Sequence, residues 1–327
     1  MTILAEKQGE IFALLAAACW AACVVPFARA TKLVGVFPVN LIRLVMTVFF
    51  LTGYGFIAHG KILPTDATAH NWLWLSLSGF AGFFIGDLFG FRALVLVGPR
   101  LSTLITASLA PPVAAVVGWI WIGESMSLVK VGGMAAIIAG VGWVVMEGTS
   151  YNHAEEYGVT PYGVFCGLAA AISQGVGLVM SKIGMKVMPA GATLADIAKL
   201  PDYDAVSATQ IRAIVAVMCL TVLILLLKRS GGLVKSIKNT KAMTYTFLAA
   251  LIGPTIGVVF MLRSLQIIPS GVVQTLIGIT PILILPVVIV FEKERVSRQA
   301  VLGTVVAVLG IGLLVLTKED VLAVLGS

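Results

Sequence analysis

The sequence predicts an all-α integral membrane protein with ten transmembrane helices, arranged as two inverted five-helix repeats. Of its 327 residues, 59% are hydrophobic and only 11% are charged, and the mean hydropathy is +1.04. A soluble fold could not bury so many apolar side chains, so lipid must surround most of the chain. The repeats are predicted because prolines and glycines of the first half recur at a constant distance in the second half.

Long apolar runs, separated by turn residues and charges, predict the individual helices. A helix rises about 1.5 Å per residue, so a hydrocarbon core of about 30 Å takes roughly 20 apolar residues to cross. The first repeat, residues 1–148, is expected to have helices at 9–29, 36–58, 72–97, 100–122 and 128–147. Residues 149–160 form a polar linker. The second repeat, residues 161–327, is expected to have helices at 161–185, 207–228, 242–266, 269–291 and 297–317.

The internal repeat is clearest when the chain is shifted by 170 residues. That shift superimposes, without a gap, Pro99 on Pro269, Pro111 on Pro281, Glu124 on Glu294, Gly133 on Gly303 and Gly140 on Gly310. Upstream, Arg43 matches Arg212 and Arg29 matches Lys182, with an insertion at 188–207. Because each unit contains an odd number of helices, the second unit enters the membrane upside down. Inverted repeats commonly build transporters around a site at the midplane.

The same residues carry a resemblance to a known family. The motifs are Gly86-Asp87, Arg92-Ala93-Leu94, Gly98-Pro99, Pro111, Gly123-Glu124 and the glycine-rich run from Gly132 to Gly142, with their echoes in the second half. In this order and spacing the sequence resembles the EamA-type ten-helix branch of the drug/metabolite transporter superfamily, from about residue 9 to 317. The resemblance implies export of amino acids, other metabolites or drugs, by exchange or proton coupling. It also implies a cavity formed by the first, third, fourth, sixth, eighth and ninth helices, with the fifth and tenth peripheral.

Asp87 is the acid placed most deeply in a predicted helix. A carboxylate in hydrocarbon costs at least about 2.5 kcal/mol, so it is expected to face protein or a water-filled cavity. It could bind a substrate ammonium or take up a coupling proton. The alternative is a structural ion pair with Arg43 or Arg92.

Polar side chains on several predicted helices could complete a binding chamber. On the helix at 161–185, Ser173 and Gln174 belong to a polar stripe with helical spacing. The substrate-binding candidates are Trp20, Asp87, Thr106, Ser173, Gln174, Thr255, Gln274 and Thr275. Each of the uncharged candidates could instead hydrogen-bond one helix to another.

Two prolines and two arginines occupy matching places in the halves. Pro111 and Pro281 are expected near the middle of their helices, where a proline kinks the axis, either as a gate or as a static bend for packing. Arg43 and Arg212 are expected to snorkel to headgroups from near their helix starts, with gating ion pairs as the alternative.

The predicted function is secondary transport of a small organic solute; the alternative is an integral-membrane enzyme acting on lipid-like substrates. No cofactor, metal site or catalytic group is expected, since Cys, His and acidic residues show no ligand spacing. No nucleic-acid site is expected either, because no basic stripe with interleaved aromatic residues and no Gly-rich phosphate loop accompanies the net charge of +7. The expected partners are a small-molecule substrate, the lipid bilayer and protons as candidate coupling ion, in a monomer or homodimer. The expected location is a bacterial inner membrane with both termini on one side. The resemblance implies cytoplasmic termini, whereas the Lys and Arg count of the loops favours the opposite orientation.

Overall fold

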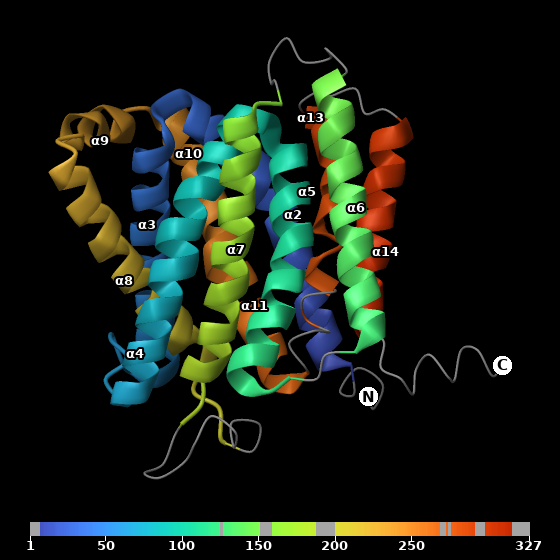
Figure 1. Cartoon of the computed structure of the whole chain (residues 1–327). Helices are drawn as coiled ribbons and strands as arrows, with labels where there is room; N and C mark the ends of the chain where they lie inside the picture. Colours follow the sequence, from blue (N-terminus) through green and yellow to red (C-terminus); the bar gives the residue numbers. More distant parts are fainter. Residues whose placement is uncertain are drawn as a thin grey trace.

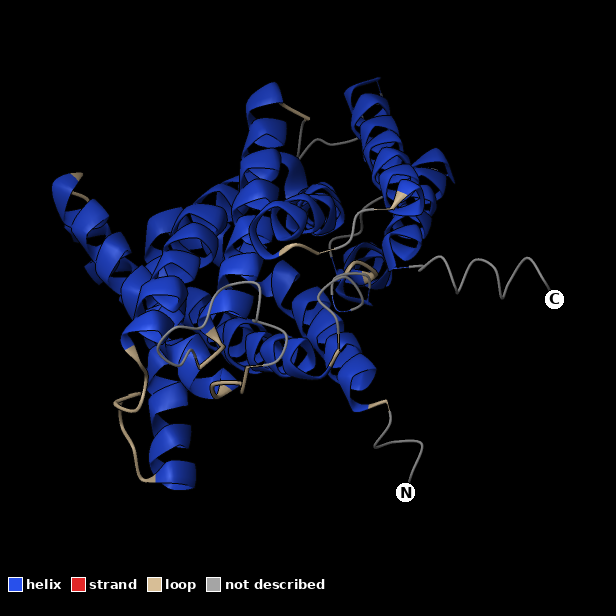
Figure 2. Ribbon diagram, turned by 60° about the horizontal axis from the view of Figure 1, so that its bottom comes forward, coloured by secondary structure: helices blue, strands red, loops and turns tan. Residues whose placement is uncertain are grey.

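The computed structural model describes residues 7–124, 127–150, 159–187, 200–268, 273, 276–291 and 298–315. Within these ranges the regular elements are helices (Figure 2). The only β pairing among the described residues is an isolated bridge between Lys186 and Asp202. In this described part of the chain, six helices are long and apolar enough to cross a membrane, and three shorter apolar helices accompany them. The prediction of an all-α membrane protein is therefore confirmed.

The helices of the first half follow the predicted segments closely (Figure 1). Their bounds are α2 Gln8–Val34, α3 Val36–His59, α4 Ala69–Ser78, η1 Gly79–Gly86, α5 Asp87–Ile122 and α6 Leu128–Ser150. Helical structure runs from Ala69 to Ile122, with one residue of non-helical conformation at Gly98, where φ is 80° and ψ is 165°. Such a positive φ favours glycine, and Pro99 follows without an amide donor. This glycine divides the expected helices at 72–97 and 100–122.

The second half contains one helix that was not expected and one predicted helix that a turn interrupts; the predicted start of that helix, residue 269, lies outside the described residues. The bounds are α7 Pro161–Gly184, α8 Ala205–Leu226, α9 Ser230–Ile237, α10 Thr240–Ala250, η3 Leu251–Gly257, α11 Val258–Ile267, α13 Thr280–Phe291 and α14 Arg298–Val315. The short α9 was predicted as loop. The predicted helix at 269–291 is interrupted by a turn at residues 278–279, and α13 begins only after it.

Among the described residues, each half contains one π-helical segment, η1 in the first and η3 in the second, and each segment ends at a glycine. Both pack against the opposite half. A Cβ on Gly86 would lie 3.1 Å from the Gln174 side chain of α7, and one on Gly257 would lie 2.9 Å from Cys19 of α2. The small residues therefore let the first helix of each half approach the π-helix of the other.

The fifth predicted helix of each half, α6 and α14, pack against each other at one edge of the bundle (Figure 1). A Cβ on Gly140 would lie 2.7 Å from the Gly303 carbonyl oxygen, and a Cβ on Gly310 would lie 2.8 Å from the Gly133 carbonyl oxygen. Gly133 and Gly140 are the repeat equivalents of Gly303 and Gly310. Each helix thus presents the same two glycines to its counterpart, and the two helices run antiparallel.

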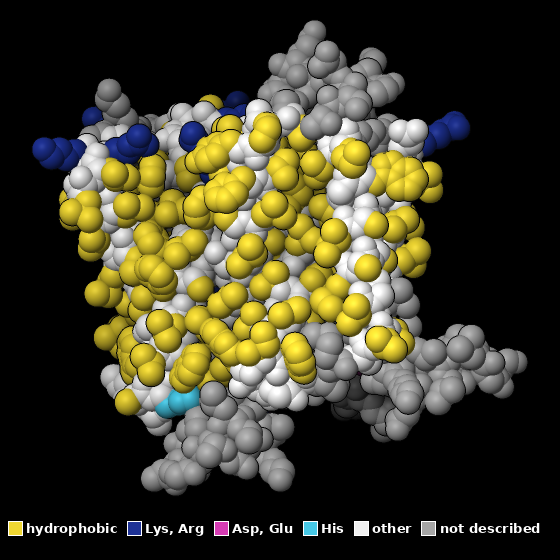
Figure 3. All heavy atoms as spheres, viewed as in Figure 1, with side chains coloured by type: hydrophobic (Ala, Val, Ile, Leu, Met, Phe, Trp, Pro, Cys, Tyr) yellow, Lys and Arg dark blue, Asp and Glu magenta, His cyan; other side chains and the backbone are white. Residues whose placement is uncertain are grey.

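The outer surface is suited to lipid. Hydrophobic side chains cover the sides of the bundle in Figure 3, while Lys and Arg side chains lie along the upper rim, near α9. Large side chains such as Ile57 and Phe49 are 86% and 75% exposed. An apolar belt of this extent on a folded chain indicates a hydrocarbon surrounding.

Candidate functional site: a central cavity with two buried arginines

A cavity of about 180 Å³ lies in the centre of the bundle. It is lined by residues of α2, α3, η1, α5, α7, α8, α11 and α13, and none of the described residues of α6 or α14 contributes. One water needs roughly 10–15 Å³ by this measure, so the space holds on the order of ten water-sized groups. That volume suits a small organic solute. Because α6 and α14 contribute no described residue to the lining, both helices lie at the periphery of the cavity.

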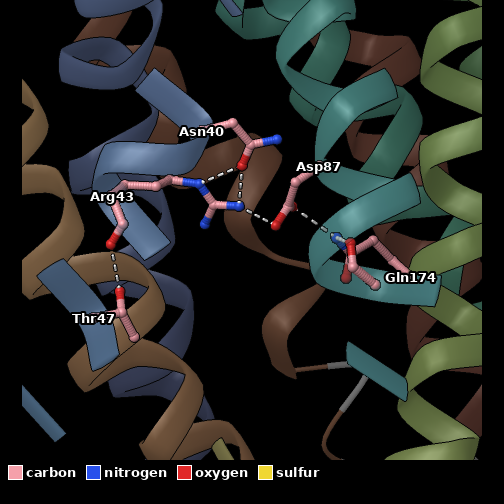
Figure 4. A network of polar contacts seen from close by, with 6 residues as sticks. Asn40, Arg43, Thr47, Asp87 and Gln174 are labelled. Atoms are coloured by element: carbon pink, nitrogen blue, oxygen red, sulfur yellow. Dashed lines mark hydrogen bonds and ion pairs between the residues drawn. The ribbon is translucent and has the colours of Figure 1, made fainter. Parts of the chain in front are cut away.

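A buried polar network occupies one wall of the cavity, where Arg43 of α3 reaches across to Asp87 at the start of α5 (Figure 4). The guanidinium of Arg43 also donates two hydrogen bonds to Asn40 Oδ1, at 2.9 and 2.7 Å. Gln174 of α7 donates to Asp87 Oδ1 at 3.0 Å and to the Gly82 carbonyl oxygen at 3.3 Å. The network ties three helices together, and Asp87 is in the ion pair with Arg43 that its sequence position suggested.

Arg212 of α8 is the second buried arginine of the cavity wall. Its side chain is 2% exposed, and its guanidinium carbon lies 4.5 Å above the Phe83 ring centroid. Its Nε and Nη1 atoms have no hydrogen-bond partner among the described residues. A buried guanidinium without acceptors is unusual, because an unmet donor carries its full desolvation cost.

The expectation that Arg43 and Arg212 snorkel to headgroups is wrong. Each lies seven residues after the first residue of its helix, Val36 or Ala205, which is about 10 Å along the axis. Both are almost completely buried, at 1% and 2% exposure. Glycines on η1 make room for Arg212, since a Cβ on Gly82 would lie 3.3 Å from its Nη2.

The structure brings four of the eight substrate-binding candidates together in the cavity wall: Trp20, Asp87, Thr106 and Gln174. The Thr106 hydroxyl is buried and has no hydrogen-bond partner among the described residues. Two other candidates, Gln274 and Thr275, fall outside the described residues.

Ser173 and Thr255 lie outside the cavity lining, contrary to expectation. Ser173 packs at the helix contact with Gly86, where an added Cβ would lie 3.3 Å from the serine Cβ. Thr255 donates a hydrogen bond to the Ala250 carbonyl oxygen at 2.8 Å inside the widened turn of η3. Ser173 therefore serves helix packing, and Thr255 bonds to the backbone of its own helix.

The two prolines predicted to be gating residues occupy different local structures. Pro111 lies inside α5, whereas Pro281 is the second residue of α13 and so lies in its first turn. A proline in a first turn needs no amide donor and does not kink the helix. The expectation of a mid-helix kink at Pro281 is therefore corrected, and neither proline lines the cavity.

Three aromatic residues of the cavity were missed by sequence reasoning, and the two arginines were not among its substrate-binding candidates. Phe27, Phe83 and Phe91 line the cavity, and the Arg43 guanidinium carbon lies 4.9 Å from the Phe91 ring centroid. Matching positions in the two halves marked the arginines, but their depth within the helices was misjudged.

Polar contacts join helix ends on both faces of the bundle. Lys182 near the end of α7 forms an ion pair of 2.5 Å with Glu124, just after α5. The labelled helix α7 ends at the lower face in Figure 1. Arg29, the repeat equivalent of Lys182, lies near the upper end of α2 and donates to the Phe291 carbonyl oxygen of α13 at 2.6 Å. The ion pair between Lys182 and Glu124 was not predicted from the sequence.

Comparison with known proteins identifies the family. One solved crystal structure, described only as "protein", superimposes with a TM-score of 0.60 at 18% sequence identity and covers 96% of this chain and 99% of that chain; this likeness shows a shared fold. No match was found among curated proteins. The sequence model of the EamA-like transporter family matches residues 7–146 and 161–316, one match in each half. The chain belongs to the EamA-like transporter family.

Proposed function

We propose that the protein is a secondary transporter that exports small organic metabolites, such as amino acids, by alternating access around the central cavity. The observation that carries the proposal is the cavity itself, which has room for a small solute between helices of both halves. A second observation is the reciprocal packing of α7 on η1 and α2 on η3. In each half, the π-helical segment packs against the first helix of the other half. A rocking motion of the two halves would therefore change the shape of the cavity walls.

We propose ten crossings and an inverted repeat, with units over 1–148 and 161–327. Ten crossings result when the stretches on either side of Gly98 are counted separately. The antiparallel glycine contacts between α6 and α14 support inversion, because they relate equivalent positions by a two-fold axis. In Figure 1, α2 begins at the lower face and its repeat equivalent α7 begins at the upper face. Opposite directions of equivalent helices are what inversion requires.

The protein is proposed to act in a bacterial inner membrane as a monomer or homodimer, with protons as candidate coupling ion and both termini cytoplasmic. Basic residues near α9 lie on the upper rim, opposite the first residues of α2 (Figures 1 and 3), and the positive-inside rule alone would place that rim in the cytoplasm. The excess of Lys and Arg on that rim comes from one short segment around α9. We therefore retain the orientation implied by the family, with both termini in the cytoplasm.

Transport is tested with purified protein in proteoliposomes loaded with unlabelled amino acids or small organic acids. Counterflow of the matching labelled solute is expected. Ala107 lines the cavity, and Ala107→Trp is expected to reduce flux to background because the indole would fill the solute space. Val116→Trp on the same α5 is the control, since Val116 is 37% exposed on the outside. Full flux in Ala107→Trp, or lipid turnover without solute flux, would contradict the proposal.

The Lys182–Glu124 ion pair is expected to favour closure of its face. Breaking it with Lys182→Gln should shift the population towards conformations open on that face by about five-fold, because a partly exposed pair contributes up to about 1 kcal/mol. Cys23 lines the cavity and can report the change. Its rate of labelling by an impermeant maleimide from that face, with the other three cysteines replaced by alanine, should rise. The exchange Lys182→Glu with Glu124→Lys should restore the slow rate; an unchanged rate in the single variant would refute the role.

A further inference from the structure

The charges in the cavity wall do not balance. Arg43, Arg212 and Asp87 all line the cavity, so the described wall carries two positive charges and one negative charge. Asp87 binds Arg43 directly and accepts a further bond from Gln174. Both of its oxygens are therefore engaged, and Arg212 acts on it only through space. The unmatched charge of this wall belongs to Arg212.

The internal repeat provides a built-in comparison for this arginine. Arg43 is held by Asn40, three residues earlier, and by Asp87, the residue after η1. The residue three positions before Arg212 is Thr209, whose hydroxyl donates to the Ala205 carbonyl oxygen of its own helix. The residue after η3 is Val258, which also lines the cavity. The second half retains the arginine and lacks both acceptors.

Packing alone does not account for a charge in this position. Desolvation of a buried guanidinium costs more than one ring contact returns, and Arg212 has Phe83 as its close aromatic neighbour. Two of its nitrogens are buried without an acceptor among the described residues. A planar guanidinium with free donors fits a carboxylate or another oxyanion, which can accept two parallel hydrogen bonds.

We propose that Arg212 is the anchor for an anionic group of the transported solute, so that the protein carries small organic acids, with a carboxylate on Arg212 and an apolar body among the cavity phenylalanines. The unpartnered Thr106 hydroxyl of the same wall offers a further polar contact. A bound monoanion would bring the net charge of the three cavity groups to zero. This inference rests on the proposed transport function and names its substrate class.

The test compares three probes of similar shape and different charge, benzoate, benzamide and benzylamine, on the purified full chain in detergent. Benzoate is expected to raise the Tm, since a ligand that binds only the folded state stabilises it. Benzamide and benzylamine at the same concentrations are expected to leave the Tm unchanged. Inorganic phosphate is included to separate a requirement for an organic carboxylate from binding of any oxyanion.

Arg212→Gln should weaken benzoate binding by roughly 10- to 100-fold, because a charge-assisted contact is lost. Without ligand, the Tm of this variant should equal or exceed that of the wild type, since an uncompensated buried charge is removed. Arg263→Gln is the matched control: Arg263 pairs with Asp204 outside the cavity, at 2.8 Å, and benzoate binding should persist.

Equal shifts with benzoate and benzamide, undiminished benzoate binding in Arg212→Gln, or a phosphate shift as large as that of benzoate would overturn the proposal. Flux is measured separately in proteoliposomes. Transport of neutral or cationic solutes without any benzoate shift would refute the anion anchor and leave the transport function standing. Benzoate binding that depends on Arg212, without flux of any organic acid, would refute the transport function instead.

Discussion

Asp87→Asn is expected to lower the free energy of unfolding by about 3–5 kcal/mol, the typical cost of leaving a buried charge without its partner. The amide keeps the size of the side chain and removes its negative charge. Arg43, 1% exposed, and Arg212, 2% exposed, would then both line the cavity, with no acid in the cavity wall described here. Two buried guanidinium groups of like charge would remain. Denaturant or thermal unfolding of the purified protein in detergent measures the loss.

A second substitution separates charge from packing at this pair. Arg43→Met in the Asp87→Asn background removes one of the two buried positive charges that lack an acidic partner. It keeps an unbranched apolar side chain against Phe91. The double variant should therefore regain a large part of the lost stability, because apolar replacement of a whole buried ion pair is often neutral. If the two substitutions instead add their costs, the pair is not energetically coupled. Wild-type stability in Asp87→Asn would refute the ion pair as a main tie between α3 and α5.

The fold was predictable from the sequence where a single physical rule dominates. Apolar length fixes a spanning helix, so α2, α3, α7 and α8 begin and end near the predicted residues. Hydropathy is insensitive to the turn-by-turn hydrogen-bond pattern, so η1 and η3 were not foreseen. The short α9 was missed because its polar composition is that of a loop.

The candidate site was predictable in part. Trp20, Asp87, Thr106 and Gln174 were identified because polar or amphipathic side chains within apolar runs need a partner or a cavity. Arg212 was misjudged because an arginine several residues from a helix start can either snorkel outward or turn inward. The choice depends on the neighbouring helix, here the glycines of η1, which sequence periodicity does not place in space.

Gly140→Ala is expected to destabilise the protein by about 1–3 kcal/mol, the usual cost of overpacking a close contact. The added Cβ would lie 2.6 Å from the Ala307 amide nitrogen and 2.7 Å from the Gly303 carbonyl oxygen. Both are backbone atoms, so α6 and α14 would have to separate. Thermal unfolding in detergent measures the effect, together with disulfide trapping of a cysteine pair across the two helices.

The control for this substitution lies on the same helix. Nothing is within 4 Å of a Cβ built on Gly132, so Gly132→Ala should leave stability equal or raise it by up to about 1 kcal/mol through helix propensity. The internal repeat also predicts the effect of the equivalent substitution in α14. Gly310, the equivalent of Gly140, would place its Cβ 2.8 Å from the Gly133 carbonyl oxygen and 2.8 Å from the Ile137 amide nitrogen. Gly310→Ala should therefore cost as much as Gly140→Ala. A large cost at one position and none at the other would mean that the two helices are not related by the two-fold axis on which the inverted repeat depends.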